Sequence, residues 1–136
     1  MKIYLDVDDT LINTDMYDIR PANHLKEFLE QMLKNHDVYW LTTHCDGDAT
    51  TAVFYMGKYV SPEVVDLIMR IKPTKWKVLK TEAINMNEDF LWFDDAPTWS
   101  DIENLKKHDK LDSLVRVNLD ENPDILKEFC KGSKAS

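Results

Sequence analysis

The chain has 136 residues and a net charge of −8, with 43% apolar and 31% charged residues. This balance is typical of one globular domain with a hydrophobic core, and it excludes a disordered chain. The acidic charge disfavours broad electrostatic binding of nucleic acid, so an anionic ligand needs a local cation or a few placed basic residues.

No apolar run approaches the roughly 20 residues of a membrane-spanning helix, so we expect no membrane contact. The first residues read as a strand rather than as a signal peptide. Two cysteines, Cys45 and Cys130, occur without a CxxC pair. That pattern is typical of thiols in a reducing compartment, and we therefore expect a cytoplasmic protein.

The first predicted elements are two buried strands and two helices. Residues 2–7 form an apolar strand, and residues 38–41 (VYWL) form another. Pro21 can open a helix. Its apolar stripe recurs at helical spacing, at Leu25, Phe28, Leu29, Met32 and Leu33. Asp48 can cap a further helix that runs to about residue 59.

The middle of the chain is less regular. Residues 64–71 (VVDLIMRI) follow Ser61-Pro62 and are compatible with either a helix or a short strand. Thr74 can cap a helix over about residues 75–86, and residues 90–93 (FLWF) read as a strand.

The last elements are a helix, a strand and a final helix. Thr98 with Asp101 is typical of a helix N-terminus, and that helix runs to about residue 108. Residues 114–119 alternate like a strand with one wetter face. Asn122-Pro123 starts a helix through Cys130, and residues 132–136 are expected to be a frayed tail.

Strands that alternate with helices predict a parallel sheet covered on both faces. The expected fold class is therefore α/β. We expect a single Rossmann-like, three-layer domain over residues 1–131. No repeat or linker divides the chain.

Ligands of such sheets collect at the carboxyl ends of the strands. The polar residues after the predicted strands, with the lysines that precede residues 90–93, are Asp6, Asp8, Thr10, Thr42, Thr43, Lys72, Lys75, Lys77, Asp94 and Asp95. Carboxylates, hydroxyls and an ammonium are thus expected at one edge of the sheet.

Carboxylates at this density stay ionised only if a cation neutralises them, and hard oxygen ligands near a phosphate suit Mg²⁺. One carboxylate of the first strand can then ligate the metal and attack phosphorus. Asp8 lies two positions on and points the same way along an extended segment, so it can reach the leaving oxygen. A threonine and a lysine can hold the phosphoryl oxygens.

The stretch DVDDT, residues 6–10, resembles the DxDx[TV] signature of the haloacid dehalogenase superfamily. VYWLT, an apolar strand ending in Thr42, resembles the second motif of that family. A lysine followed by an apolar strand and Asp94-Asp95 resembles the third and fourth motifs. The four occur in order over residues 2–102. Residues 20–32 (RPANHLKEFLEQM) look like the first core helix of capless members. The stretches WLTTH, KWKVL and WFDDAP look like the small dehalogenase-type domains attached to bacterial RNA-repair proteins.

The resemblance implies a Mg²⁺-dependent phosphohydrolase that acts on a phosphomonoester through an aspartyl-phosphate intermediate. Asp6 matches the nucleophile, Asp8 the general acid/base and Thr42 the phosphoryl-binding hydroxyl. The family's metal ligands match Asp6, the main-chain carbonyl of Asp8, and Asp95. Asp94 matches a residue that supports these ligands without binding the metal directly.

Three lysines compete for the family's phosphate-binding position. Lys75 follows an expected helix cap and suits a lysine at a helix start. Lys72 belongs to a Lys-Pro pair typical of many members and is the runner-up, and Lys77 stays open.

The family inserts cap domains in two intervals, which are short in this chain. Residues 11–20 have room for a flap, and residues 44–71 for one helix and a short further element. We therefore expect no cap domain and an open site. An open site favours a large substrate, such as a phosphorylated macromolecule or a nucleic-acid end, over a small sugar phosphate. A nucleotide or another small phosphate stays an alternative, and the oligomeric state is left open.

Two other functions would use the same types of residue. A non-enzymatic phosphoacceptor, resembling a response-regulator receiver, or a phosphate-binding module would also use acidic residues, a hydroxyl and a lysine. Receivers place the lysine last, whereas Asp94-Asp95 follow the lysines here. His44 and Cys45 could line the pocket but are favoured as loop residues. The basic run over residues 70–80 could steer phosphate but is favoured as a solvated helix face.

Overall fold

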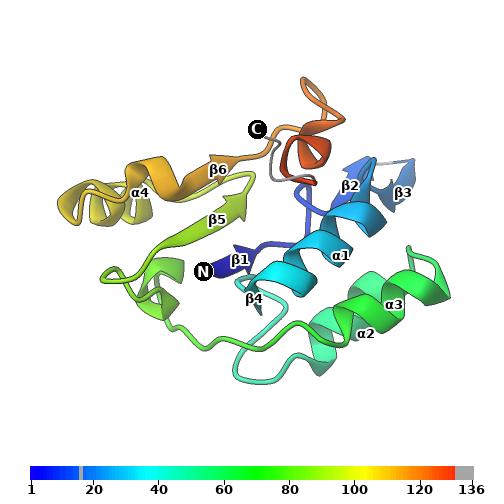
Figure 1. Ribbon diagram of the computed structural model, residues 1–136, viewed down its shortest axis with the longest axis horizontal. Coiled ribbons are helices and arrows are strands. Elements are labelled where there is room, and N and C mark those ends of the chain that lie inside the picture. The colour runs from blue at the N-terminus through cyan, green and yellow to red at the C-terminus, as the bar shows by residue number, and fades with distance from the viewer. Residues whose placement is uncertain (16, 131–136) are drawn as a thin grey trace.

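A four-stranded parallel sheet forms the centre of the protein in a computed structural model that describes residues 1–15 and 17–130 (Figure 1). The strands lie in the order β4-β1-β5-β6. Their bounds are Lys2–Leu5 for β1, Asp37–Trp40 for β4, Phe90–Asp94 for β5 and Leu114–Arg116 for β6. The first three lie where their apolar runs predict strands, and β6 is shorter than predicted.

The central strands are apolar on both faces because two separate clusters of side chains cover them. Ile3 and Leu5 of β1 belong to one cluster, and Tyr4 between them belongs to the other. This alternation follows from the two-residue repeat of a strand. Continuous apolar runs, rather than alternating ones, are typical of parallel strands buried on both sides.

Three α-helices and a 3₁₀ turn contribute to the cluster that contains Ile3 and Leu5. Their bounds are Leu25–Asn35 for α1, Thr50–Gly57 for α2, Pro62–Ile68 for α3 and Ile125–Phe129 for η3. Figure 1 shows α2 and α3 lying below α1 in that view. The stripe of α1 is buried as predicted at Leu25, Phe28, Leu29 and Met32.

The other cluster lies between the sheet and two helical elements, η1 (Lys80–Ala83) and α4 (Trp99–Lys107). Leu105 of α4 packs there with Tyr4 and Trp92. A short turn, η2 (Leu111–Ser113), leads into β6. Helical elements therefore flank the sheet, and the expectation of an α/β fold with a parallel sheet is confirmed.

A small antiparallel hairpin occupies the interval after β1. It consists of β2 (Ile12–Asp15) and β3 (Asp18–Pro21). Pro21 pairs with Ile12 at the end of β3, so the prediction that it opens a helix is wrong. The amide of Ala22 donates to the carbonyl of Leu11 at 2.8 Å, which keeps this segment extended. Helix α1 begins four residues after Pro21, at Leu25.

The predicted helix over residues 75–86 is also wrong. The hydroxyl of Thr74 donates to the carbonyl of Trp40 at 2.5 Å instead of capping a helix. The carbonyl of Thr74 accepts from the amide of Gly47 at 2.8 Å. These contacts tie the segment to the end of β4, and the only helical structure among residues 75–86 is the 3₁₀ turn η1, which begins at Lys80.

The ambiguity over residues 64–71 is resolved in favour of a helix, since α3 extends to Ile68 and is capped by Ser61. Lys72 then forms an isolated parallel bridge with Tyr39 at the edge of β4. The predicted start of α4 is confirmed, because Thr98 Oγ1 accepts from the amide of Asp101 at 3.1 Å.

The final predicted helix is only a 3₁₀ turn, η3, and the predicted tail over residues 132–136 lies outside the described residues. No helix in the described part of the chain combines the length and apolar character needed to cross a membrane.

Candidate functional site

Three carboxylates meet where β1 and β5 end. Asp6 follows β1, Asp94 is the last residue of β5, and Asp95 follows it. Each offers one oxygen such that the three oxygens all lie within 4.8 Å of one another. Asp6 and Asp94 are buried, and Asp95 is half-buried. Like charges this close in a low dielectric repel strongly unless a cation lies among them.

The parallel register explains why these side chains meet. Leu5 pairs with Phe93, and the amide of Asp6 donates to the carbonyl of Phe93 at 3.1 Å. Asp6 and Asp94 are therefore neighbours at the ends of two adjacent strands.

Lys80 provides the cation that lies against this cluster. Its Nζ lies 3.2 Å from Asp6 Oδ1 and 2.6 Å from Asp94 Oδ2, and only 15% of its side chain is exposed. The other oxygen of Asp94 accepts from the amide of Ala96 at 2.9 Å. Both oxygens of Asp94 are thus engaged within the protein, which leaves Asp95 the more available ligand of this pair.

Burial and the neighbouring charges together shift the pKa values of the cluster. Burial raises the pKa of Asp6 to about 7; the charge of Asp94 adds to the rise, and Lys80 opposes it. Burial also raises the pKa of Asp95. Burial alone would lower the pKa of Lys80, but the charges of Asp6 and Asp94 outweigh it and the net shift is upward. One ammonium therefore does not neutralise the cluster.

A divalent cation fits this donor set. The candidate side-chain ligands, Asp6, Asp94 and Asp95, are all carboxylates with hard oxygen donors, which suits Mg²⁺ better than a thiophilic metal. A bound cation would favour the ionised form of Asp6, whose pKa burial raises.

Asp8 lies two residues after Asp6, and two aromatic side chains hold its carboxylate. The hydroxyl of Tyr55 on α2 lies 2.6 Å from Asp8 Oδ1, and His44 Nε2 lies 3.0 Å from Asp8 Oδ2. The two rings stack, with centroids 4.1 Å apart and planes 15° from parallel. Burial raises the pKa of Tyr55, and its hydrogen bond to Asp8 raises it further, so this hydroxyl keeps its proton and donates a hydrogen bond to Asp8.

These partners of Asp8 were not found by sequence reasoning. The sequence favours His44 as a loop residue, and no motif points to Tyr55. Tyr55 is 47 residues from Asp8 in the chain. No local spacing links two positions so far apart, and only the packing of α2 against the sheet brings them together.

Thr42 follows β4, the strand on the other side of β1. Its side chain is fully buried, and its Oγ1 accepts from the amide of His44 at 3.2 Å. Thr42 therefore orders the loop that carries His44. Thr10, two residues after Asp8, is also buried, and its hydroxyl lies 3.5 Å from Asp6 Oδ2.

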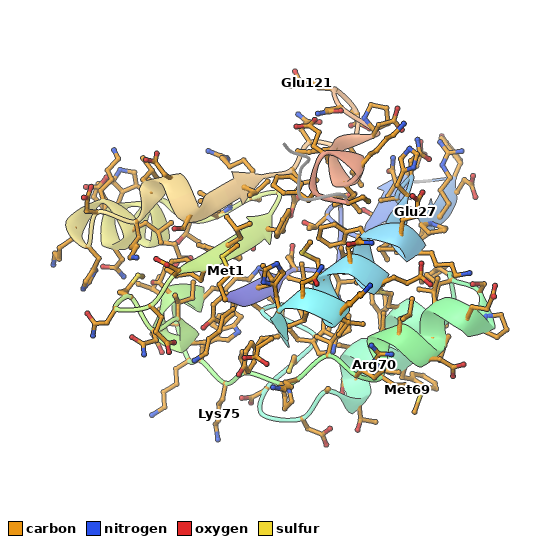
Figure 2. All side chains as sticks on the ribbon, viewed as in Figure 1. Met1, Glu27, Met69, Arg70, Lys75 and Glu121 are labelled. Atoms are coloured by element: carbon orange, nitrogen blue, oxygen red, sulfur yellow. The ribbon has the colours of Figure 1, made fainter. Side chains whose placement is uncertain are left out.

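The lysines chosen from the sequence lie elsewhere. Lys75 is exposed, and Figure 2 shows its side chain projecting away from the body of the molecule. Lys72 pairs with Asp37 at 3.3 Å. The backbone amide of Lys77 donates to Glu82, and its side chain is exposed.

Lys80 was missed because of the wrong helix boundary. The resemblance implies a lysine at a helix start, and the sequence places that helix start at Lys75. The helical turn begins five residues later, at Lys80 itself.

Comparisons of the chain with protein-family models, with curated proteins and with solved structures found no match. The arrangement of the carboxylates, Lys80 and Asp8 is therefore what supports a function.

Proposed function

We propose that the protein is a Mg²⁺-dependent phosphohydrolase of the haloacid dehalogenase type, acting on a phosphomonoester through an aspartyl-phosphate. One observation carries the proposal. Asp6, Asp94 and Asp95 each place an oxygen within 4.8 Å of the others, the ammonium of Lys80 contacts Asp6 and Asp94, and Asp8 lies two residues from Asp6. Such a site combines a nucleophile, a cation-binding cluster and an acid/base at the carboxyl edge of a parallel sheet.

Asp6, Asp95 and the main-chain carbonyl of Asp8 would hold Mg²⁺, with Asp94 behind them. The bound ion would neutralise the carboxylates and offset the charge of the phosphoryl oxygens. Lys80 would hold a phosphoryl oxygen at the same time, because its ammonium already lies between Asp6 and Asp94. The proposed role of Thr42 is to donate its hydroxyl hydrogen to another phosphoryl oxygen.

In the first step, a carboxylate oxygen of Asp6 attacks phosphorus. The new oxygen–phosphorus bond forms as the bond to the leaving oxygen breaks, and protonated Asp8 delivers its proton to that oxygen. The products are an alcohol and phosphorylated Asp6. In the second step, Asp8 takes a proton from water as the water oxygen attacks phosphorus. Phosphate departs, and the carboxylate of Asp6 is restored.

The finer description of the fold belongs to the same proposal. We take the fold to be Rossmann-like with three layers and no cap domain, because the two insertion intervals contain the β2–β3 hairpin and the helices α2 and α3. A cytoplasmic location is likewise proposed.

The experiment measures the turnover of p-nitrophenyl phosphate by the purified protein and compares the rate in Mg²⁺ with the rate in EDTA. We expect many turnovers per protein molecule with Mg²⁺ and almost none with EDTA. Release of no more than one equivalent of nitrophenol, with phosphate left on the protein, would instead favour the phosphoacceptor reading. No reaction under either condition would overturn the proposal.

A further inference from the structure

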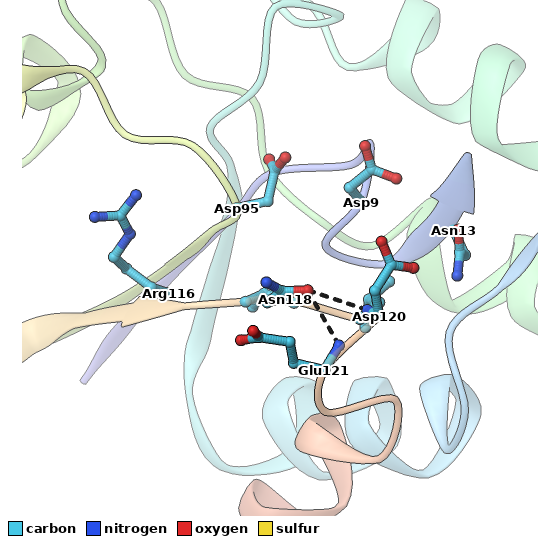
Figure 3. A pocket seen from close by; sticks show the side chains of 9 residues that line it. Asp9, Asn13, Asp95, Arg116, Asn118, Asp120 and Glu121 are labelled. Atoms are coloured by element: carbon cyan, nitrogen blue, oxygen red, sulfur yellow. Dashed lines mark hydrogen bonds between the residues drawn. The ribbon is translucent and has the colours of Figure 1, made fainter. Parts of the chain in front are cut away.

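A cavity of about 510 Å³ adjoins the carboxylate cluster at Asp95 (Figure 3). It lies between the turn after β1, the end of β5 and the loop after β6. Its lining residues are Asp9, Asn13, Asp95, Arg116, Val117, Asn118, Leu119, Asp120 and Glu121. Ligand cavities commonly have volumes of about 300–1,000 Å³, so this one has room for more than a phosphate group.

Asp95 belongs both to this cavity and to the cluster that contains Asp6. A phosphomonoester with its phosphorus at Asp6 can therefore extend its organic part into the cavity. Figure 3 shows Arg116 at one end and Asn13 at the opposite end, with Asp95 and Asp9 between them.

The cavity offers both hydrogen-bond donors and acceptors. Asn118 Oδ1 already accepts from the amides of Asp120 and Glu121, at 3.1 and 3.2 Å, so its side-chain NH₂ is left to donate. Asp9 Oδ1 accepts from the amide and hydroxyl of Thr14, at 3.0 and 2.7 Å, which leaves Oδ2 as an acceptor. These internal bonds also fix the side chains in place before any ligand arrives.

The chemistry of the lining restricts the ligand. Four carboxylates face one guanidinium, Arg116, so a second phosphate would be repelled. A purely apolar group would displace water from carboxylates and amides without replacing their hydrogen bonds. Hydroxyl groups fit both needs, because each can donate to a carboxylate and accept from an amide or guanidinium.

We propose that this cavity binds the hydroxylated leaving group of the substrate, a ribose or another sugar or polyol joined to the phosphate. This inference rests on the proposed phosphohydrolase function and names its substrate class. A ribose can come from a nucleotide or a nucleic-acid end, and the same vicinal hydroxyls occur in free sugar phosphates. The cavity thus supplies the selectivity that a cap domain would otherwise provide.

The test compares kcat/KM for glycerol 3-phosphate and propyl phosphate, which share a carbon chain and differ in two vicinal hydroxyls. We expect glycerol 3-phosphate to be favoured about 10-fold or more, in line with two hydrogen bonds that involve charged groups. The same comparison of kcat/KM is then made for ribose 5-phosphate against its 2-deoxy analogue, and for a ribonucleoside 5′-monophosphate against its 2′-deoxy analogue. The larger ratio shows which source of hydroxyls is preferred.

Variants assign the preference to the cavity. Asp120→Asn and Arg116→Ala should each lower the ratio of kcat/KM for glycerol 3-phosphate to that for propyl phosphate by about 10-fold. Asp112→Asn is the matched control, because Asp112 is exposed on η2 and does not line the cavity.

Two failures can be told apart. Turnover of p-nitrophenyl phosphate that needs Asp6 and Mg²⁺, with the ratio near one or unchanged in both cavity variants, overturns the inference and leaves the function standing. Absence of Mg²⁺-dependent turnover for every ester overturns both.

Discussion

The hydroxyl of Tyr55 lies 2.6 Å from Asp8 Oδ1 and donates to it. His44 contacts the other oxygen of Asp8 and stacks on the tyrosine ring. Asp8 is therefore held at both oxygens, although 41% of its side chain is exposed. In the proposed mechanism, these contacts keep the acid/base aimed at the leaving oxygen.

Tyr55→Phe tests this positioning role. Loss of the donor should let Asp8 adopt other rotamers, and we expect kcat to fall by about 10-fold with KM little changed. Steady-state kinetics with an alkyl phosphate measures the effect. Tyr59→Phe is the matched control, because it removes a hydroxyl from a ring that packs edge-on against Tyr55, with the ring centroids 5.8 Å apart. Equal effects of both variants would contradict a specific role for the Tyr55 hydroxyl.

Asp8→Asn removes the acid itself. Alkyl phosphates have poor leaving groups that need the proton, whereas nitrophenolate departs without it. We therefore expect a much larger loss of kcat/KM for propyl phosphate than for p-nitrophenyl phosphate. Equal losses for the two esters would argue against proton transfer by Asp8.

Lys80→Met leaves Asp6 and Asp94 without their ammonium, since its Nζ contacts both carboxylates. Removing a charged donor to phosphoryl oxygens typically lowers turnover by about 10²-fold or more, and we expect a loss of that size. Lys75→Met makes the same chemical change at an exposed position and should have little effect. A greater loss in Lys75→Met than in Lys80→Met would restore the lysine predicted from the sequence.

The position of Lys80 at the start of η1 shows which features of the fold could be predicted from the sequence and which could not. Apolar runs predicted β1, β4 and β5, because a strand buried on both faces must be apolar throughout. The helix expected after Thr74 did not form, because its hydroxyl bonds to the carbonyl of Trp40, 34 residues away. Tertiary contacts of this kind override local capping signals.

The same limit applies to the candidate site. Asp6 and Asp94-Asp95 could be predicted to meet because each follows an apolar strand, and parallel strands end at one edge. The cavity beside Asp95 could not be predicted, because β6 was expected to continue to residue 119. Its end at Arg116 leaves the following residues as a loop that lines the cavity.

Asp6 should make the metal-free protein less stable as pH rises from about 4 to 7. The pKa of Asp6 is about 7 when folded, against an ordinary value of 3.8, so between these values the folded protein binds a proton that the unfolded chain releases. The stability that Asp6 contributes is then fully present below about pH 4 and is lost as pH rises toward 7. Thermal melts in EDTA at several pH values measure this trend.

Mg²⁺ should reverse the trend by binding the ionised cluster. We expect the rise in Tm on adding millimolar Mg²⁺ to be small at pH 5 and larger at pH 8. In the Asp6→Asn variant, the fall in Tm with rising pH in EDTA should be smaller. The rise in Tm on adding Mg²⁺ should be smaller too. A Tm that Mg²⁺ leaves unchanged at pH 8 would contradict the proposed metal site, in which Asp6 and Asp95 are the side-chain ligands.

The central claim is that Asp6 is the nucleophile, and the rate of Mg²⁺-dependent p-nitrophenyl phosphate hydrolysis by Asp6→Asn tests it most directly. Asp46→Asn is the control, because Asp46 is exposed and outside the carboxylate cluster. Melting temperatures in EDTA establish that both variants fold. We predict that Asp6→Asn loses nearly all turnover while Asp46→Asn keeps the wild-type rate. A folded Asp6→Asn protein that hydrolyses the ester at the wild-type rate would contradict the mechanism.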